Sequence, residues 1–459
     1  MLGERPLDPE QPPLPRRAHA RRPDLHDPLR RTALVSKFKD DARCGCDEGS
    51  KLVSRRSVLR AALAAAAAGV TTYAVGDVST QVSFAGTGWN GETLVVLSLH
   101  GGFDGLSAVV PGGDAGYYAA RPNIAVPRST LLGLDQTFGL HPAMAPLMPL
   151  WRNGTFGVVH AVGQAEPTRS HFAAMERMEL AAPGSSVRTG WIDRTLGSLG
   201  TGSVLNAVGI SNTPARAFAG PAQETTMTSL DGFSLIGPGD DRPTWHAALR
   251  RMHTGARPEV AQPASTLLTA MEDVAGLRGT ASGPANGAVY PDSDLGRALA
   301  EAAVLKKSGA PVQVIALDYG DWDMHAGLGR VDGGWMRDKL TELSSALAAF
   351  ATDLGGSFAS TTLVTLSEFG RRVGENASGG LDHGHGNAVL LLGGGVVGGR
   401  VHGVWPGLGA DRLVDGDLAG TTDYRSVIGE VLQKRCGAGS LSAIFPGFSG
   451  APLGVVRSR

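Results

Sequence analysis

The stretch LVTLSEFGRRVGENASGGLDHGHGN, residues 363–387, determines the predicted fold, because it joins two apolar runs through a loop rich in ionisable groups. The first run, 363–366, ends next to Glu368, and the second occupies 388–392. Short apolar runs bounded by turn residues are typical of buried strands. The glycine-rich loop between them carries three ionisable residues close together: Asp382, His383 and His385. The stretch is therefore predicted to form a strand, a polar loop and a second strand.

A divalent metal is the simplest explanation for this loop. Carboxylates and imidazoles packed so densely are costly to gather without a counter-ion, and both are common ligands of Zn²⁺ and related ions. The alternative is a histidine-rich surface loop held by hydrogen bonds. Two further polar clusters elsewhere in the chain favour the metal.

Charge and cysteine content exclude several classes of protein. The chain has 459 residues and a formal net charge of -1, with 14 Lys and Arg against 9 Asp and Glu up to Arg60 and 28 against 34 beyond it. The mildly acidic body argues against a nucleic-acid partner, which would need a basic stripe. Cys436 is the single cysteine beyond the leader, so no disulfide framework and no redox cysteine pair is available there.

The start of the chain resembles an export signal. The segment SRRSVLR, residues 54–60, has the paired arginines of a twin-arginine signal, and an alanine-rich apolar run follows at 61–70. That run is too short, and its flank too basic, for an ordinary membrane span. The alternative is an arginine pair at the start of a buried helix.

We therefore predict a disordered basic leader at 1–53 and a twin-arginine signal peptide at 54–85. The twin-arginine export machinery would be a partner, the mature protein would keep no stable membrane span, and its place would be extracytoplasmic: periplasmic, in the cell envelope or secreted. Twin-arginine export carries folded proteins, which suits a chain that receives a metal before it leaves.

Strand and helix patterns alternate through the body, 90–455, and this favours an α/β fold with a mainly parallel sheet. The predicted strands are 93–99, 156–162, 204–210, 311–317, 363–366 and 388–392. The predicted helices are 141–151, 173–180, 191–199, 245–277 with an interruption near 255–263, 295–307, 336–354 and 423–433. Residues 212–243 are irregular and are interpreted as an insertion or a cap over the site.

Polar residues follow the predicted strands, where ligands bind in parallel sheets. The candidates for metal binding are Asp104, Asp321, Asp323, His325, Glu368, Asp382, His383 and His385. The candidates for catalysis are Ser170, His171 and Arg371. For single residues the alternatives are ordinary: Asp104 as a helix or turn cap, Ser170 as a helix N-cap, His171 as a packing residue, and each arginine as a surface residue.

One sheet edge with several carboxylates, several imidazoles and a hydroxyl has the composition of a two-metal hydrolase. The mixture of nitrogen and oxygen ligands suits Zn²⁺ or Mn²⁺ better than Ca²⁺. In such a site Ser170 or a water is the nucleophile toward phosphorus or sulfur, and Arg169, Arg371 or Arg372 binds the equatorial oxygens.

Several motifs in this order resemble one family: the twin-arginine leader, HGGFDGLS, TRSHF, DWDMHAG, LSEFGR and DHGHG. Together they are similar to the family called domain of unknown function 1501. That family looks like a distant branch of the alkaline phosphatase, sulfatase and cofactor-independent phosphoglycerate mutase superfamily. The resemblance implies an alkaline-phosphatase-like three-layer α/β/α sandwich with one or two bound ions.

Some residues of this chain match the superfamily pattern, and others depart from it. Asp104 matches the metal-binding Asp after the first strand, and Ser170, with Thr168 as second choice, matches the nucleophile. Asp321 or Asp323 with His325 matches one metal pair. In the superfamily a later Asp-His pair directly follows a strand, whereas here Glu368 occupies that position and the pair at Asp382 arrives after a loop, with His385 as the final ligand.

Two functions remain from the sequence. The first is an exported metal-dependent hydrolase of phosphate or sulfate esters, acting on a small-molecule or polymer substrate. The second is a non-catalytic extracytoplasmic binding or assembly protein on the same fold. A redox enzyme has little support, since the glycine run at 393–399 lacks the strand-then-helix context of a dinucleotide site.

Overall fold

The computed structural model describes residues 90–459 except 201–202, 223, 234–241 and 279–282. The predicted leader and signal peptide lie outside the described residues. Within the described part, no helix has the length and apolarity that a membrane crossing requires.

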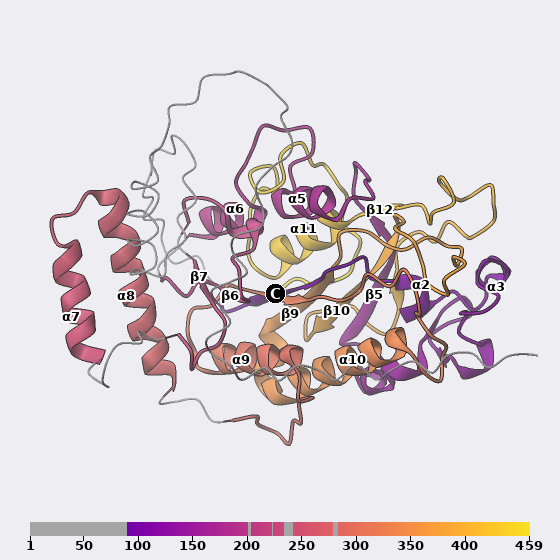
Figure 1. Ribbon diagram of the computed structural model, residues 1–459, viewed down its shortest axis with the longest axis horizontal. Coiled ribbons are helices and arrows are strands. Elements are labelled where there is room, and N and C mark those ends of the chain that lie inside the picture. Colours follow the sequence, from indigo (N-terminus) through magenta and orange to yellow (C-terminus); the bar gives the residue numbers. More distant parts are fainter. Residues whose placement is uncertain (1–89, 201–202, 223, 234–241, 279–282) are drawn as a thin grey trace, which may run out of the picture. The chain divides into compact units, whose positions relative to one another are not determined.

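A mainly parallel sheet of nine strands forms the centre of the fold (Figure 1). Its strands are β1 (Thr93–Leu99), β5 (Phe156–Gly163), β6 (Ala207–Ile210), β7 (Thr225–Met227), β8 (Val314–Tyr319), β9 (Thr361–Leu366), β10 (Asn387–Gly393), β11 (Val401–His402) and β12 (Thr422–Asp423). The order is β11-β5-β10-β9-β1-β8-β6-β7, with β12 also paired to β5. Only β10 runs against the others, because it is antiparallel to both β9 and β5.

Alternating side chains of the strands build two separate cores, one on each face of the sheet. In β1, Val95 and Leu97 pack on one face, while Leu94 and Val96 pack on the other. The helices α9 (Asp294–Lys307) and α10 (Trp335–Leu354) cover the first face. Three other helices cover the second: α5 (His171–Leu180), α6 (Trp191–Leu199) and α11 (Tyr424–Lys434). The predicted three-layer α/β/α sandwich is thus confirmed.

The remaining helices and strands complete the described part. They are α2 (Gly105–Ala108), α3 (Ala115–Ala120), α4 (Met148–Arg152), α7 (Arg242–His253), α8 (Pro258–Arg278), η2 (Arg128–Thr130), η3 (Pro142–Leu147), η4 (Arg216–Phe218), η5 (Gly355–Ser360) and a small sheet of β2 (Val109–Val110), β4 (Gly139–Leu140) and β3 (Leu132–Gly133).

Two predicted elements differ from the structure. The helix predicted at 141–151 begins as the 3-10 turns of η3, because Pro142 and Pro146 cannot donate backbone hydrogen bonds. The stretch 212–243, predicted to be irregular, contains η4 and the edge strand β7, which pairs in parallel with β6. A three-residue strand such as β7 is too short for its alternation to stand out in the sequence.

The topology brings the polar segments to one edge of the sheet. β1 lies between β8 and β9, with Leu99 opposite Tyr319 and Ser98 opposite Leu366, so these three strands end together. β5 runs in the same direction and leads into α5. Because β10 is reversed, it begins at the edge where the others end, and the loop before it arrives there too.

Candidate metal centre

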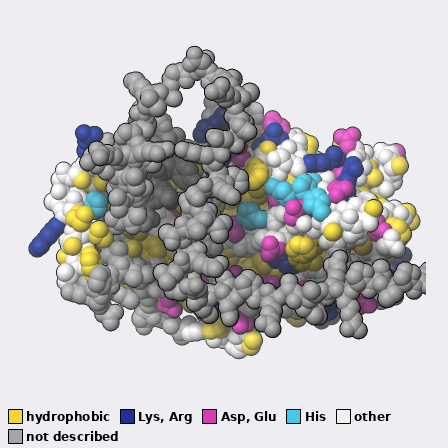
Figure 2. Space-filling view, in the orientation of Figure 1, with side chains coloured by type: hydrophobic (Ala, Val, Ile, Leu, Met, Phe, Trp, Pro, Cys, Tyr) yellow, Lys and Arg dark blue, Asp and Glu magenta, His cyan; other side chains and the backbone are white. Residues whose placement is uncertain are grey.

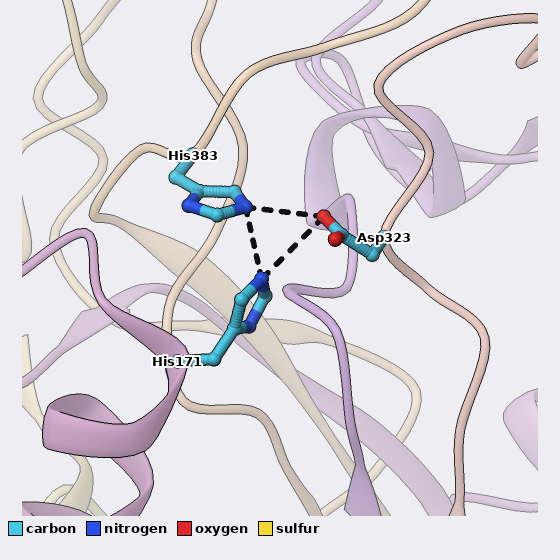
Figure 3. Close-up of side chains that lie close together, drawn as sticks. All are labelled: His171, Asp323 and His383. Atoms are coloured by element: carbon cyan, nitrogen blue, oxygen red, sulfur yellow. Dashed lines mark hydrogen bonds and ion pairs between the residues drawn. The ribbon is translucent and has the colours of Figure 1, made fainter. Parts of the chain in front are cut away.

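Four side-chain atoms converge on one point at this edge: Nε2 of His171, His325 and His383, and Oδ1 of Asp323. The Nε2 atom of His383 lies 2.9 Å from each of the other two Nε2 atoms and 3.1 Å from Asp323 Oδ1. Asp323 Oδ1 is 3.1 Å from His325 Nε2 and 3.5 Å from His171 Nε2. Figure 3 shows His171, Asp323 and His383 pointing toward one another from the start of α5 and from two loops.

The other nitrogen of each ring identifies what the converging atoms are. Nδ1 of His171 lies 2.7 Å from Glu368 Oε1, and Nδ1 of His325 lies 3.1 Å from Asp382 Oδ1. Nδ1 of His383 lies 2.8 Å from the backbone oxygen of Arg169. These oxygens only accept hydrogen bonds, so each neutral ring carries its proton on Nδ1 and presents a lone pair at Nε2.

Four lone-pair atoms this close repel one another unless a cation lies between them. The three separations among His171, Asp323 and His383, 2.9–3.5 Å, are close to the tetrahedral edge of about 3.3 Å that follows from Zn–N bonds of about 2.0–2.1 Å. A histidine that donates its second nitrogen to a carboxylate or carbonyl is also the usual arrangement of a metal ligand. His171, Asp323 and His383 therefore fit a divalent ion, and His325 Nε2 lies next to two of these three ligand atoms.

Asp323 is held as an anion by its neighbours. Partial burial would raise the pKa of this carboxyl, but the hydrogen bond and charge of Arg371, together with the neighbouring imidazoles of His383 and His171, lower it to about 2. Arg371 donates from Nη2 to Asp323 Oδ1 at 2.6 Å. An ionised carboxylate is the form that a metal requires.

Arg371 is buried, and its N–H groups donate hydrogen bonds to other groups of the protein. Its remaining donors reach the backbone oxygens of Gly102 at 2.7 Å, Leu381 at 2.9 Å and Trp322 at 3.0 Å, together with that of Gly101. The guanidinium thus joins the loop after β1, the loop after β8 and the loop before β10. In this position it fixes Asp323 and leaves no face for a substrate oxygen, whereas the sequence suggested a catalytic role.

At Gly101 the backbone of the loop after β1 closely approaches the backbone of the loop after β8. A Cβ atom added to Gly101 would lie 2.7 Å from the Asp323 nitrogen, and the residue has a φ of +110°. Glycine alone tolerates both conditions without strain. The Gly101 amide also donates to Glu368 Oε1 at 2.8 Å, the oxygen that His171 contacts.

The structure assembles five of the eight predicted metal residues, in two roles. Asp323, His325 and His383 supply converging atoms, while Glu368 and Asp382 lie behind them and orient rings of His171 and His325. His171, which the sequence placed among the catalytic residues, supplies the fourth converging atom. Its sequence signal was present, since TRSHF was a family motif, but nothing local to that motif identifies the ring as a ligand.

Asp104 does not join the centre. Its two oxygens accept from the guanidinium of Arg121 at 2.6 and 3.0 Å, and both side chains are buried. Burial would raise the pKa of Asp104, but the charge and hydrogen bonds of Arg121 lower it. Because both oxygens of Asp104 contact the buried guanidinium of Arg121, this carboxylate has a structural role in a buried ion pair.

Three other predicted residues also lie apart from the converging atoms. Asp321 occupies the left-handed region with a φ of 63° and is exposed. His385 Nε2 lies 3.2 Å from the backbone oxygen of Gln164. Ser170 is the N-cap of α5, directly before His171; its side chain is exposed and makes no capping hydrogen bond.

A cavity of about 590 Å³ opens beside the centre. Its lining includes His171, Asp323 and Glu368, and also His100, Asp318 and Glu179. Figure 2 shows histidine side chains gathered at the surface of one face with acidic and basic groups around them. His100 and Asp318 were not selected from the sequence, although both sit at strand ends like the residues that were.

The comparison with family models finds one family. Residues 158–428 match the model described as "Protein of unknown function (DUF1501)", the family that the motifs indicated. No curated protein matches the chain.

Among solved structures the chain is remotely similar to three bacterial proteins. These are the C-terminal periplasmic domain of EcEptC from Escherichia coli (12% identity, 79% of this chain and 89% of that one, TM-score 0.31), the PsFucS1 sulfatase from Pseudoalteromonas sp. (13%, 80% and 74%, TM-score 0.34) and the phosphonate monoester hydrolase of Agrobacterium radiobacter (9%, 79% and 78%, TM-score 0.31).

Proposed function

The chain belongs to the DUF1501 family of proteins of unknown function, and on that premise we propose an activity from its own site. In this proposal the protein is a metal-dependent hydrolase of phosphate or sulfate esters, and it is exported through the twin-arginine machinery. One divalent ion, with Zn²⁺ preferred over Mn²⁺, is held by His171, Asp323 and His383, with His325 beside them. The observation that carries the proposal is the convergence of Nε2 of His171, Nε2 of His383 and Oδ1 of Asp323 at 2.9–3.5 Å.

The donor set supports one ion and favours zinc. Imidazole nitrogens together with one carboxylate oxygen suit Zn²⁺ better than Mg²⁺ or Ca²⁺, which prefer sites made of oxygen ligands. In the described part of the chain, the group at His171, Asp323 and His383 is the one cluster of metal-ligating side chains close enough to hold an ion. The proposal therefore includes one bound ion, whereas the residue composition of the sheet edge also allowed two.

Other residues of the chain orient the metal ligands and supply the nucleophile. When bound, the ion supplies Lewis-acid polarisation of an ester oxygen and a positive charge. Glu368 and Asp382 keep the rings of His171 and His325 in the correct tautomer, and Arg371 holds Asp323 in place. Ser170, exposed directly before His171, is the proposed nucleophile, with a water as the alternative.

The cavity makes substrate binding dependent on the ion. Five carboxylates line it (Glu176, Glu179, Asp318, Asp323 and Glu368) against one arginine, Arg216, which pairs with Glu176 at 2.9 Å. Burial raises the pKa of Glu179 to about 7, so this group carries only part of a charge at neutral pH, but the remaining carboxylates still repel a phosphate or sulfate ester. Removal of the ion should therefore weaken substrate binding as well as turnover.

A second function rests on the number of ligands. Four protein ligands are typical of structural zinc, whereas catalytic zinc usually keeps a position free. If His325 joins the other three as a fourth ligand, the site is of the structural kind, which favours a non-catalytic binding protein. Against it, the side chains of Asp323 and His325 are 47% and 46% exposed, and the centre lies at the edge of a cavity, so a substrate oxygen has access for a fifth ligand position.

Metal content tests the proposal first. We expect one equivalent of zinc in the purified protein by elemental mass spectrometry, and none after His171→Ala with His383→Ala. His385→Ala is the matched control, because this histidine lies in the same loop and outside the centre; it should keep the metal. A folded wild-type protein without metal, unchanged by chelator, would overturn the site.

Activity then separates the two functions. For a hydrolase, phosphate or sulfate esters are cleaved by the zinc-loaded protein and not by the double variant, while both remain folded by circular dichroism. For a binding protein with structural zinc, no ester is cleaved and chelation unfolds the chain.

A further inference from the structure

A second pair of polar residues, His100 and Asp318, lines the cavity beside the metal centre. His100 directly follows β1, and Asp318 lies in the neighbouring strand β8, opposite Ser98. His100 Nε2 is 2.7 Å from Asp318 Oδ1, and both side chains are about one third exposed, at 35% and 37%. Both line the cavity that His171 and Asp323 also line.

The pair is rigidly connected to the metal centre through backbone groups. The Trp322 amide, next to Asp323, donates to the His100 oxygen at 3.2 Å. The Gly101 amide donates to Glu368 Oε1, which contacts His171 Nδ1. His100 is therefore held at a fixed position relative to the centre without contacting its ligands.

The surrounding charges favour the protonated form of His100. Burial lowers the pKa of the ring, but the hydrogen bond and charge of Asp318 and the charges of Glu368 and Glu179 outweigh it, so that the pKa is raised. These groups face the ring from β8, from the loop after β9 and from α5. The protonated ring donates from Nε2 to Asp318, and its Nδ1–H has no hydrogen-bond partner among the described residues.

We infer that His100 is the proton donor to the leaving group, and that Asp318 is its positioning residue; this rests on the proposed hydrolase function. The nucleophile, Ser170 or water, forms a bond to phosphorus or sulfur and loses its proton to solvent. The bond from that atom to the ester oxygen breaks, and its electron pair stays on the oxygen. The oxygen takes the proton from His100 Nδ1, which leaves a neutral ring that still donates to Asp318.

Leaving-group dependence is the direct test of a proton donor. The probes are the 4-nitrophenyl and phenyl esters of phosphate and of sulfate, hydrolysed by the zinc-loaded protein. Phenolate leaves poorly without a proton and 4-nitrophenolate leaves well. We expect His100→Gln to lower kcat on the phenyl ester by about 100-fold, the lower end for general acid catalysis, and to change kcat on the 4-nitrophenyl ester only a few-fold.

Asp318→Asn supplies a readout that a structural role would not move. Activity that needs protonated His100 falls as the pH rises through its pKa, and Asp318 raises that pKa. The alkaline limb of kcat for the phenyl ester should therefore move to lower pH in Asp318→Asn. His253→Gln, on α7 and outside the cavity lining, is the control. It should change neither the ratio of kcat on the phenyl ester to kcat on the 4-nitrophenyl ester nor the pH of the alkaline limb.

Two results would overturn the inference in distinguishable ways. If the wild-type protein cleaves both esters and His100→Gln, with its zinc retained, loses both equally or neither, then His100 is no proton donor and the hydrolase proposal stands. If the zinc-loaded wild-type protein cleaves none of the probes, the hydrolase proposal fails and this inference fails with it.

Discussion

Asp104 and Asp323 are both carboxylates that follow neighbouring strands of one sheet, and both contact an arginine, yet their surroundings are opposite. Asp104 is buried with both oxygens on Arg121. Asp323 is half exposed, has one oxygen on Arg371, and turns the same oxygen toward three imidazole nitrogens. The comparison shows that a carboxylate at a strand end becomes a metal ligand through its partners, and not through its place in the sheet.

Breaking the buried pair should have the largest effect. Asp104→Ala leaves Arg121 charged and fully buried without its carboxylate, which costs about 3–5 kcal/mol of the free energy of unfolding. Urea denaturation of the metal-free protein measures the loss. The folded fraction should still bind one equivalent of zinc; loss of zinc with unchanged stability would place Asp104 at the centre.

Asp323→Asn should give the reverse pattern. The amide oxygen still accepts from Arg371, and the pair is half exposed, so the metal-free protein should lose about 1 kcal/mol or less. Zinc binding, measured by competition with a chromophoric chelator, should be lost because a neutral amide is a poor ligand. If stability falls as far as in Asp104→Ala, the two carboxylates are equivalent and the comparison fails.

The residues behind the ligands should have a smaller effect on zinc affinity. Glu368→Ala and Asp382→Ala each remove the acceptor that orients a histidine ring, and such changes typically cost 10–100-fold in affinity. The buried Glu368 should approach the upper value and the exposed Asp382 the lower, because water replaces a lost acceptor only at an exposed position. Equal or absent effects would show that the rings are oriented by packing alone.

The pH dependence of stability sharpens the comparison at acidic pH. The pKa of Asp104 is lowered in the folded protein by Arg121, so its contribution is present above the unfolded value of about 3.9 and is lost as the pH falls through the folded pKa. The difference in unfolding free energy between wild type and Asp104→Asn should therefore shrink below about pH 3.9. A difference that stays constant down to pH 2 would contradict the charged pair.

The sequence by itself determined the strands and the types of residue at their ends. Continuous apolar runs predicted β1, β5, β9 and β10 to within two residues, because burial on both faces leaves a clear pattern. It also determined that Asp323, His325 and His383 were candidates for a metal, since imidazoles and carboxylates so close in sequence need a counter-charge.

Only the tertiary structure decided which of these residues meet. A buried strand has the same apolar pattern whether it is parallel or antiparallel, so the reversal of β10, which brings His383 to the common edge, left no local signal. The selection of His171 as a ligand and the exclusion of Asp104 depended on side chains from distant segments, Glu368 and Arg121. Pairing of charges across the fold is a property of distances in space, and spacing along the chain does not encode it.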